Sequence, residues 1–141
     1  NIGSTSANTE IVKAAKTTLG TVITDEQQRM KNLGSGTTIL GAGDATYGPG
    51  GQSFGAGVYN IEDILSVTAE SEIKLLGSGY ANESWVFNIG NYMVFGAGAK
   101  VVLDNVNNNS NVIWNILGDS TGGAGLGYAT LGAGVDFTGS I

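Results

Sequence analysis

The sequence predicts a mostly β fold, a β-solenoid (β-helix) of about three to four stacked coils, accompanied by one long α-helix. Three segments between Val58 and Ile141 each begin with an aliphatic residue, an aromatic residue, Asn and Ile. Their aromatic residues, Tyr59, Phe87 and Trp114, lie 28 and 27 residues apart. A period in the twenties, made of short strands, is typical of a solenoid in which each repeat stacks on its neighbours.

Apolar and polar residues alternate within each segment, which indicates strands with one buried and one wet face. Equivalent residues of successive coils should then form rows through the stack. We expect two interior rows, one of Ala69, Ala97 and Ala133 and one of Ile73, Val101 and Phe137. The residues expected to fill the interior are Leu65, Val67, Ile73, Phe95, Val101, Leu131 and Phe137. A plain antiparallel sandwich is the alternative fold that this pattern leaves open.

A single domain over residues 1–141 is predicted, organised as a helix, a connector and the coils. Apolar residues at three- and four-residue steps predict a helix over 8–34. Packing on the domain's own sheet is favoured for it over a membrane or partner helix, because its polar face is not basic. Residues 35–57 are predicted to be an irregular connector, with Thr37 to Leu40 as a possible strand, and 58–141 the repeated coils. The apolar side chains expected to be buried against the coils are Ile11, Leu19, Val22, Ile23 and Met30.

The predicted helix is longer than the predicted stack. About 25 residues span ~37 Å at 1.5 Å per residue, whereas three and a half coils at ~4.8 Å each span only ~17 Å. Either the helix crosses the stack, or additional strands cover its end. We therefore expect a neighbouring chain, or strands from one, at that end.

Composition restricts the function. The chain has 6 basic and 12 acidic residues, a net charge of −6, which argues against nucleic acid or an anionic membrane as a partner. No apolar run is long enough for a transmembrane helix, so no membrane insertion is expected. The chain begins at Asn1 without a signal peptide, which is typical of a processed form.

Nothing in the sequence predicts catalysis. The chain has no His and no Cys, so imidazole bases, thiolate nucleophiles and the usual zinc ligands are missing. Glu70 and Glu72 fall on the wet parity near Lys74, where a solvated charge cluster is favoured over a glycosidase pair. We predict a protein that is not an enzyme, with no catalytic residues, no metal site and no cofactor. Asn82 and Asn108 begin glycosylation triplets on predicted corners, and both are candidates for modification.

The repeats resemble the ice-binding (antifreeze-like) proteins of the widespread bacterial, fungal and algal type. The residues that carry the resemblance include Trp85 to Gly90, Ala97 to Leu103, Asn111 to Ile116 and Ala129 to Ile141. The resemblance implies a discontinuous right-handed β-solenoid with the long helix along its side. It also implies that the family's β-segment before the helix and its last strands after Ile141 are missing here.

The same resemblance implies a secreted protein, extracellular or at the cell surface, that binds ice crystals through a flat face of low charge. The row Glu72, Lys100 and Asp136 is charged and therefore unsuitable, and for the neutral row Asn60, Asn88 and Asn115 the direction is open. The candidate ice-binding residues are Ser66, Thr68, Val94, Gly96, Thr130 and Gly132.

Two further functions stay open. Open solenoid edges template pairing with other strands, so the chain is alternatively a self-assembling structural subunit of an extracellular filament or surface layer. Its partners are then copies of itself. A carbohydrate-binding or adhesive module is the third hypothesis, which rests only on the tyrosines Tyr47, Tyr59, Tyr80, Tyr92 and Tyr128.

Overall fold

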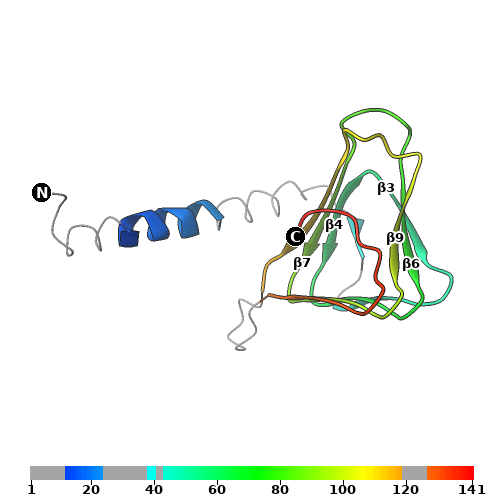
Figure 1. Ribbon diagram of the computed structural model, residues 1–141, viewed down its shortest axis with the longest axis horizontal. Helices are drawn as coiled ribbons and strands as arrows, with labels where there is room; N and C mark the ends of the chain where they lie inside the picture. Colours follow the sequence, from blue (N-terminus) through cyan, green and yellow to red (C-terminus); the bar gives the residue numbers. More distant parts are fainter. Residues whose placement is uncertain (1–11, 24–37, 41–42, 119–126) are drawn as a thin grey trace, which may run out of the picture.

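The computed structural model describes residues 12–23, 38–40, 43–118 and 127–141 (Figure 1). Residues 12–23 form an α-helix, and eleven short strands follow in the described part of the chain. The strands are β1 (Thr38–Ile39), β2 (Ala45–Tyr47), β3 (Gln52–Gly55), β4 (Gly57–Ile61), β5 (Leu65–Val67), β6 (Glu72–Leu76), β7 (Ser84–Ile89), β8 (Met93–Phe95), β9 (Lys100–Asp104), β10 (Asn111–Ile116) and β11 (Ala129–Leu131).

Three parallel sheets form the sides of a triangular stack. Sheet A has the strand order β1-β4-β7-β10, sheet B has β11-β8-β5-β2, and sheet C has β3-β6-β9. The chain visits A, B and C in turn and then starts again, so each strand pairs with its equivalent from the preceding or following repeat. Figure 1 shows sheets A and C as two sides of a triangle, with sheet B closing the third. This mostly β arrangement is compatible with the predicted β-solenoid.

The repeat of aromatic residue, Asn and Ile in the sequence corresponds to one turn of the stack in the structure. Tyr59 pairs with Phe87, and Phe87 with Trp114, on adjacent strands of sheet A. Their rings stack at centroid distances of 5.3 Å and 4.4 Å. Aromatic pairs contribute about 0.5–1.5 kcal/mol beyond the area that they bury, so this column reinforces the in-register pairing. An antiparallel sandwich is excluded for the described strands, because every pairing between them is parallel.

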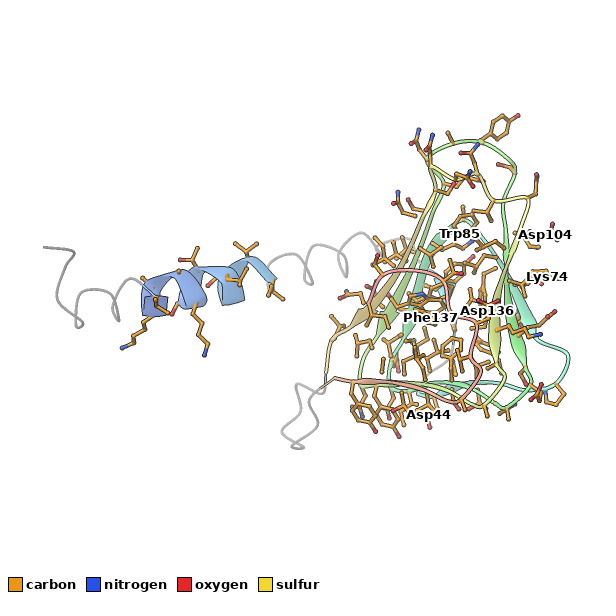
Figure 2. The ribbon with its side chains drawn as sticks, in the orientation of Figure 1. Asp44, Lys74, Trp85, Asp104, Asp136 and Phe137 are labelled. Atoms are coloured by element: carbon orange, nitrogen blue, oxygen red, sulfur yellow. The ribbon has the colours of Figure 1, made fainter. Side chains whose placement is uncertain are left out.

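The predicted interior is mostly confirmed. Phe95 and Ile73 are fully buried, and the wider interior comprises Leu65, Val67, Leu75, Trp85, Phe87, Ile89, Met93, Ala99, Val101 and Trp114. Figure 2 shows Trp85 and Phe137 within the triangle and Lys74 and Asp104 outside sheet C. Leu131 was expected inside but is 44% exposed. Leu131 lies on β11, the edge strand of sheet B, where it pairs with Phe95 of β8, and no further strand of this sheet covers it among the described residues.

The alanine row was predicted wrongly. Ala69, Ala97 and Ala133 are exposed, because the alternation stops where each strand of sheet B ends. The Ser71 amide donates to the Thr68 carbonyl at 3.2 Å, which closes a turn between β5 and β6. The turn shifts the phase, so that Ala99, one position before β9, is buried instead.

The connector prediction is also corrected. Strands β1, β2 and β3 lie inside the range 35–57, and they pair with β4, β5 and β6. Short strands separated by glycine turns lack the aromatic-Asn-Ile signature, so the repeat was not visible there. The possible strand at Thr37 to Leu40 corresponds in part to β1.

The predicted burial of the helix is wrong for the residues that the structure describes. Leu19, Val22 and Ile23 are 61%, 57% and 52% exposed. Figure 1 shows helix 12–23 projecting away from the triangle beyond sheet A. Its apolar stripe is real, but periodicity does not say which surface covers it. Ile11, Met30 and the rest of the predicted helix range lie outside the described residues.

Candidate functional site

The three sheets share one interior but present three different outer faces. Alternation along each strand decides which side chains point outward, and the strand register places equivalent residues next to one another. Strands lie ~4.8 Å apart, so each outward row is a regularly spaced line of side chains. The three faces can therefore be compared row by row.

The outer face of sheet B is centred on a row of small uncharged side chains. Ser66 pairs with Val94, and Val94 with Thr130, so half of the predicted ice-binding residues form one line. Thr46 extends this line on β2 and pairs with Ser66. Thr46 was missed because β2 lies in the presumed connector. The line thus carries three hydroxyl-bearing side chains and one valine across the four strands of sheet B.

The remaining predicted residues flank this line where the strands end. Thr68 follows β5, Gly96 follows β8 and Gly132 follows β11. A Cβ at Gly96 would lie 2.5 Å from the Ala69 nitrogen, and one at Gly132 would lie 2.7 Å from the Ala97 nitrogen. The glycines therefore have a structural role, since they let the turns of successive repeats pack closely. They also leave this edge of the face without protruding groups.

The opposite edge of the face carries two tyrosines. The rings of Tyr92 and Tyr128 stack with a centroid distance of 4.6 Å and an angle of 7° between their planes. Desolvation and the neighbouring Tyr128 raise the pKa of Tyr92, and Asp44 and Asp63 act in the same direction. Tyr92 therefore stays neutral near neutral pH.

The outer face of sheet C differs sharply. Glu72 pairs with Lys100, which in turn bridges to Asp136, as the sequence analysis predicted for this row. Lys74 and Asp104 also lie on the outer side of this sheet (Figure 2). Charged side chains hold their own hydration shells, so this face does not offer the low-charge surface that ice binding requires.

The outer face of sheet A is neutral but mostly buried. Asn60, Asn88 and Asn115 alternate with the inward aromatic column, so their row points away from the interior. The Asn88 side-chain amide donates to the Asn60 oxygen, and the Asn115 amide donates to the Asn88 oxygen, each at 2.9 Å. Asn88 and Asn115 are only 2% and 6% exposed. This amide ladder stabilises the stack, and its burial leaves little surface for a ligand.

The two glycosylation candidates lie at one corner, between sheets C and A. Asn82 precedes β7 and has a φ of 66°, and Asn108 precedes β10. Both side chains are exposed. The corner is remote in the fold from sheet B, so modification there would leave the sheet B face open. Glycosylation itself stays a prediction.

A hollow of about 1100 Å³ opens at the C-terminal end of the stack. It lies along the edge of β10 and beside the last residues of the chain, and Val22 and Ile23 reach its rim. Within the described residues no cluster of three or more acidic side chains is arranged to hold a metal ion. The same part of the chain contains no helix long and apolar enough to cross a membrane.

Comparison with known proteins agrees with the resemblance seen in the repeats. A family model described as ice-binding-like matches residues 2–141. No curated protein and no solved structure gave a match. A match over nearly the whole length, together with the repeated parallel strands, shows that the chain belongs to the ice-binding-like family.

Proposed function

We propose that this protein binds ice crystals through the outer face of sheet B and that it performs no catalysis. The observation that carries the proposal is the in-register row of Thr46, Ser66, Val94 and Thr130 on a surface without a charged side chain in that row. Regularly spaced hydroxyl and methyl groups on a rigid, flat sheet hold water in an ordered layer. The sheet is held rigid by the inward side chains of its central strands β5 and β8, which are buried in the interior.

We further propose where the protein acts and in which direction its coils wind. Ice crystals that threaten a cell form outside it, so an ice-binding protein would act as a secreted protein, in the medium or at the cell surface. The family membership supports the right-handed winding of three to four coils expected from the resemblance. A crystal structure would test the winding, and fractionation of the producing cells would test the location.

Ice recrystallisation and thermal hysteresis test the function directly. We expect the folded protein to slow recrystallisation at micromolar concentration and the heat-unfolded protein to have no effect. A matched pair of serines tests the face: Ser66→Glu on sheet B should abolish the activity, whereas Ser53→Glu on sheet C should retain it. If the folded wild type behaves like an ordinary protein in both assays, the proposal is wrong.

Self-assembly into an extracellular filament or surface layer is the second candidate function. β11 is the edge strand of sheet B among the described strands, and an edge strand that is open can pair with strands of other chains, which favours this function. A filament that grows by one repeated contact needs two complementary ends. At the N-terminal end, however, Phe54 packs against both Tyr47 and Tyr59 and is only 3% exposed. Negative-stain imaging separates the candidates, since only the second predicts long polymers.

A further inference from the structure

Two tyrosines lie side by side at the corner between sheets A and B. Tyr92 precedes β8 and Tyr128 precedes β11, and the next residues, Met93 and Ala129, are partners in the register. The Met93 amide donates to the Tyr128 carbonyl at 3.0 Å, and the Leu65 amide donates to the Tyr92 carbonyl at 3.1 Å. The parallel ladder therefore holds the two tyrosines in successive repeats together, although they are 36 residues apart in the sequence.

The rings of Tyr92 and Tyr128 are arranged for a reaction between them. Their centroids lie 4.6 Å apart and their planes are within 7° of parallel, so the rings are in van der Waals contact. A hydrogen bond between the two side chains also brings their hydroxyl ends together. The ortho carbons, which flank each hydroxyl, are thereby neighbours. These carbons carry much of the unpaired electron density of a tyrosyl radical, so they are the atoms that couple.

The other three tyrosines have different surroundings. Tyr47 and Tyr59 each make an edge-to-face contact with Phe54, which has no phenol to couple with. Tyr80 lies in the corner between sheets C and A and is 76% exposed. Among the described residues, which include all five tyrosines, Tyr92 and Tyr128 are therefore the one pair of tyrosines whose rings touch.

The remaining side chains that oxidants attack readily are missing or protected. The chain has no Cys and no His. Trp85 and Trp114 are 0% and 1% exposed, and Met93 is fully buried, whereas Met30 lies outside the described residues. Tyr128, in contrast, is 49% exposed. An oxidant in solution therefore reaches the tyrosine pair before it reaches the aromatic residues of the interior.

We propose that Tyr92 and Tyr128 are joined by a dityrosine cross-link when the protein meets hydrogen peroxide and a haem peroxidase. The peroxidase removes one electron and one proton from each phenol, and the peroxide that accepts them becomes two molecules of water. The two phenoxyl radicals then form one carbon–carbon bond between their ortho positions. The hydrogens at those two carbons move to the phenol oxygens as the rings regain aromaticity, so the product has lost two hydrogen atoms.

The bond acts as a covalent staple between two repeats. It ties the residue before β8 to the residue before β11, and a cross-link between distant residues restricts the unfolded chain and so favours the folded state. The staple lies at the edge of the sheet B face and leaves its central row of Ser66, Val94 and Thr130 unmodified. The inference therefore does not depend on the proposed function.

Treatment of the dilute protein with peroxidase and hydrogen peroxide tests the cross-link. We expect a monomeric product with dityrosine fluorescence and a mass lower by two hydrogen atoms, and proteolysis should release two peptides joined through Tyr92 and Tyr128. Tyr92→Phe keeps a stacked ring without the phenol and should form no link within the chain. Tyr80→Phe is the matched control and should link as the wild type does. A wild type that forms no link within the chain, or one through another tyrosine, overturns the inference.

Two further measurements keep the test decisive if Tyr92→Phe fails to fold. The wild type treated in concentrated urea should give much less of the Tyr92–Tyr128 link, because the stacked corner is lost. An equal yield with and without urea would show that the folded corner does not direct the coupling, and the inference would be wrong. The cross-linked monomer should also unfold at a higher temperature than the untreated protein, and an unchanged midpoint would refute the staple.

Discussion

Sheets B and C are built by the same repeat and pack on the same interior, yet their outer faces have opposite chemical character. Sheet B presents a row of Thr, Ser and Val, whereas sheet C presents Glu72, Lys100 and Asp136 in the equivalent outward position. Inward residues on the central strands β5, β8 and β6 of these two sheets are apolar and buried. The comparison shows that the interior residues specify the fold and that the outward rows are free to specify function.

The largest expected effect comes from a substitution in the interior that sheets B and C share. Phe95 is fully buried and makes edge-to-face contacts with Trp114 and Phe137 at 5.8 Å and 5.4 Å. Phe95→Ala should lower the free energy of unfolding by about 3–5 kcal/mol, through lost burial and the cavity left behind. Urea unfolding followed by tryptophan fluorescence measures the change. A loss below about 1 kcal/mol would mean that this row is not packed as described.

A smaller effect is expected on sheet A, where the outward row is buried. Asn88 both donates to Asn60 and accepts from Asn115. Asn88→Ala removes these two hydrogen bonds between side-chain amides in a buried ladder, which should lower the free energy of unfolding by about 2–3 kcal/mol. Thermal unfolding of the variant measures this loss. Asn60→Ala, at the end of the ladder, is the control and should cost less, since only one bond is lost.

A stabilising change is expected at the turn between sheets B and C. Glu70 has a φ of 57°, and the equivalent turns carry Gly98 and Gly134, each with a φ of 71°. A non-glycine residue in the left-handed region costs about 1–2 kcal/mol, so replacing it by glycine removes this strain. The larger conformational entropy that glycine has in the unfolded chain offsets part of the gain in stability. Glu70→Gly should therefore raise the unfolding free energy by about 0.5–1 kcal/mol. Ala97→Gly, one position before Gly98, is the control and should not stabilise the protein.

The smallest effect is expected on the charged face. Lys100 is exposed on sheet C, between Glu72 and Asp136 in the register. Exposed charge pairs contribute little, so Lys100→Ala should change the unfolding free energy by less than about 0.5 kcal/mol. Thr68→Ala should cost more, about 1 kcal/mol, because the Thr68 hydroxyl lies 2.8 Å from the Ser71 hydroxyl and Ser71 is buried.

Much of the fold was predictable because equivalent positions of successive repeats carry side chains of the same type. The aromatic residue followed by Asn and Ile gave the register of β4, β7 and β10, and alternation gave the interior of β5, β8 and β6. Alternation predicted Ala69 wrongly because the turn after β5 changes which positions face inward, and the residue types in the turn do not reveal this change. Strands β2 and β3 were missed because a three- or four-residue strand between glycines carries too little pattern.

The candidate face was predictable only in part. Ser66, Val94 and Thr130 were found because parity and low charge single them out. Thr46 belongs to the same row but could be placed only by its pairing with Ser66. The direction of Asn60, Asn88 and Asn115 could not be decided either, because strands buried on both faces lose the alternation. The position of the helix could not be predicted, because it depends on long-range contacts and the spacing of apolar residues within the helix carries no information about them.

The most direct test of the account compares one substitution on the two faces. Val94 and Val102 are both half-buried outward valines, on sheets B and C. Val94→Glu and Val102→Glu change the net charge equally, and both variants should fold, as checked by circular dichroism. Partition of labelled protein into a growing ice hemisphere then measures ice binding. We expect Val102→Glu to enter the ice like the wild type and Val94→Glu to be excluded at least tenfold more strongly. Equal incorporation of the two variants would contradict the assignment of ice binding to sheet B.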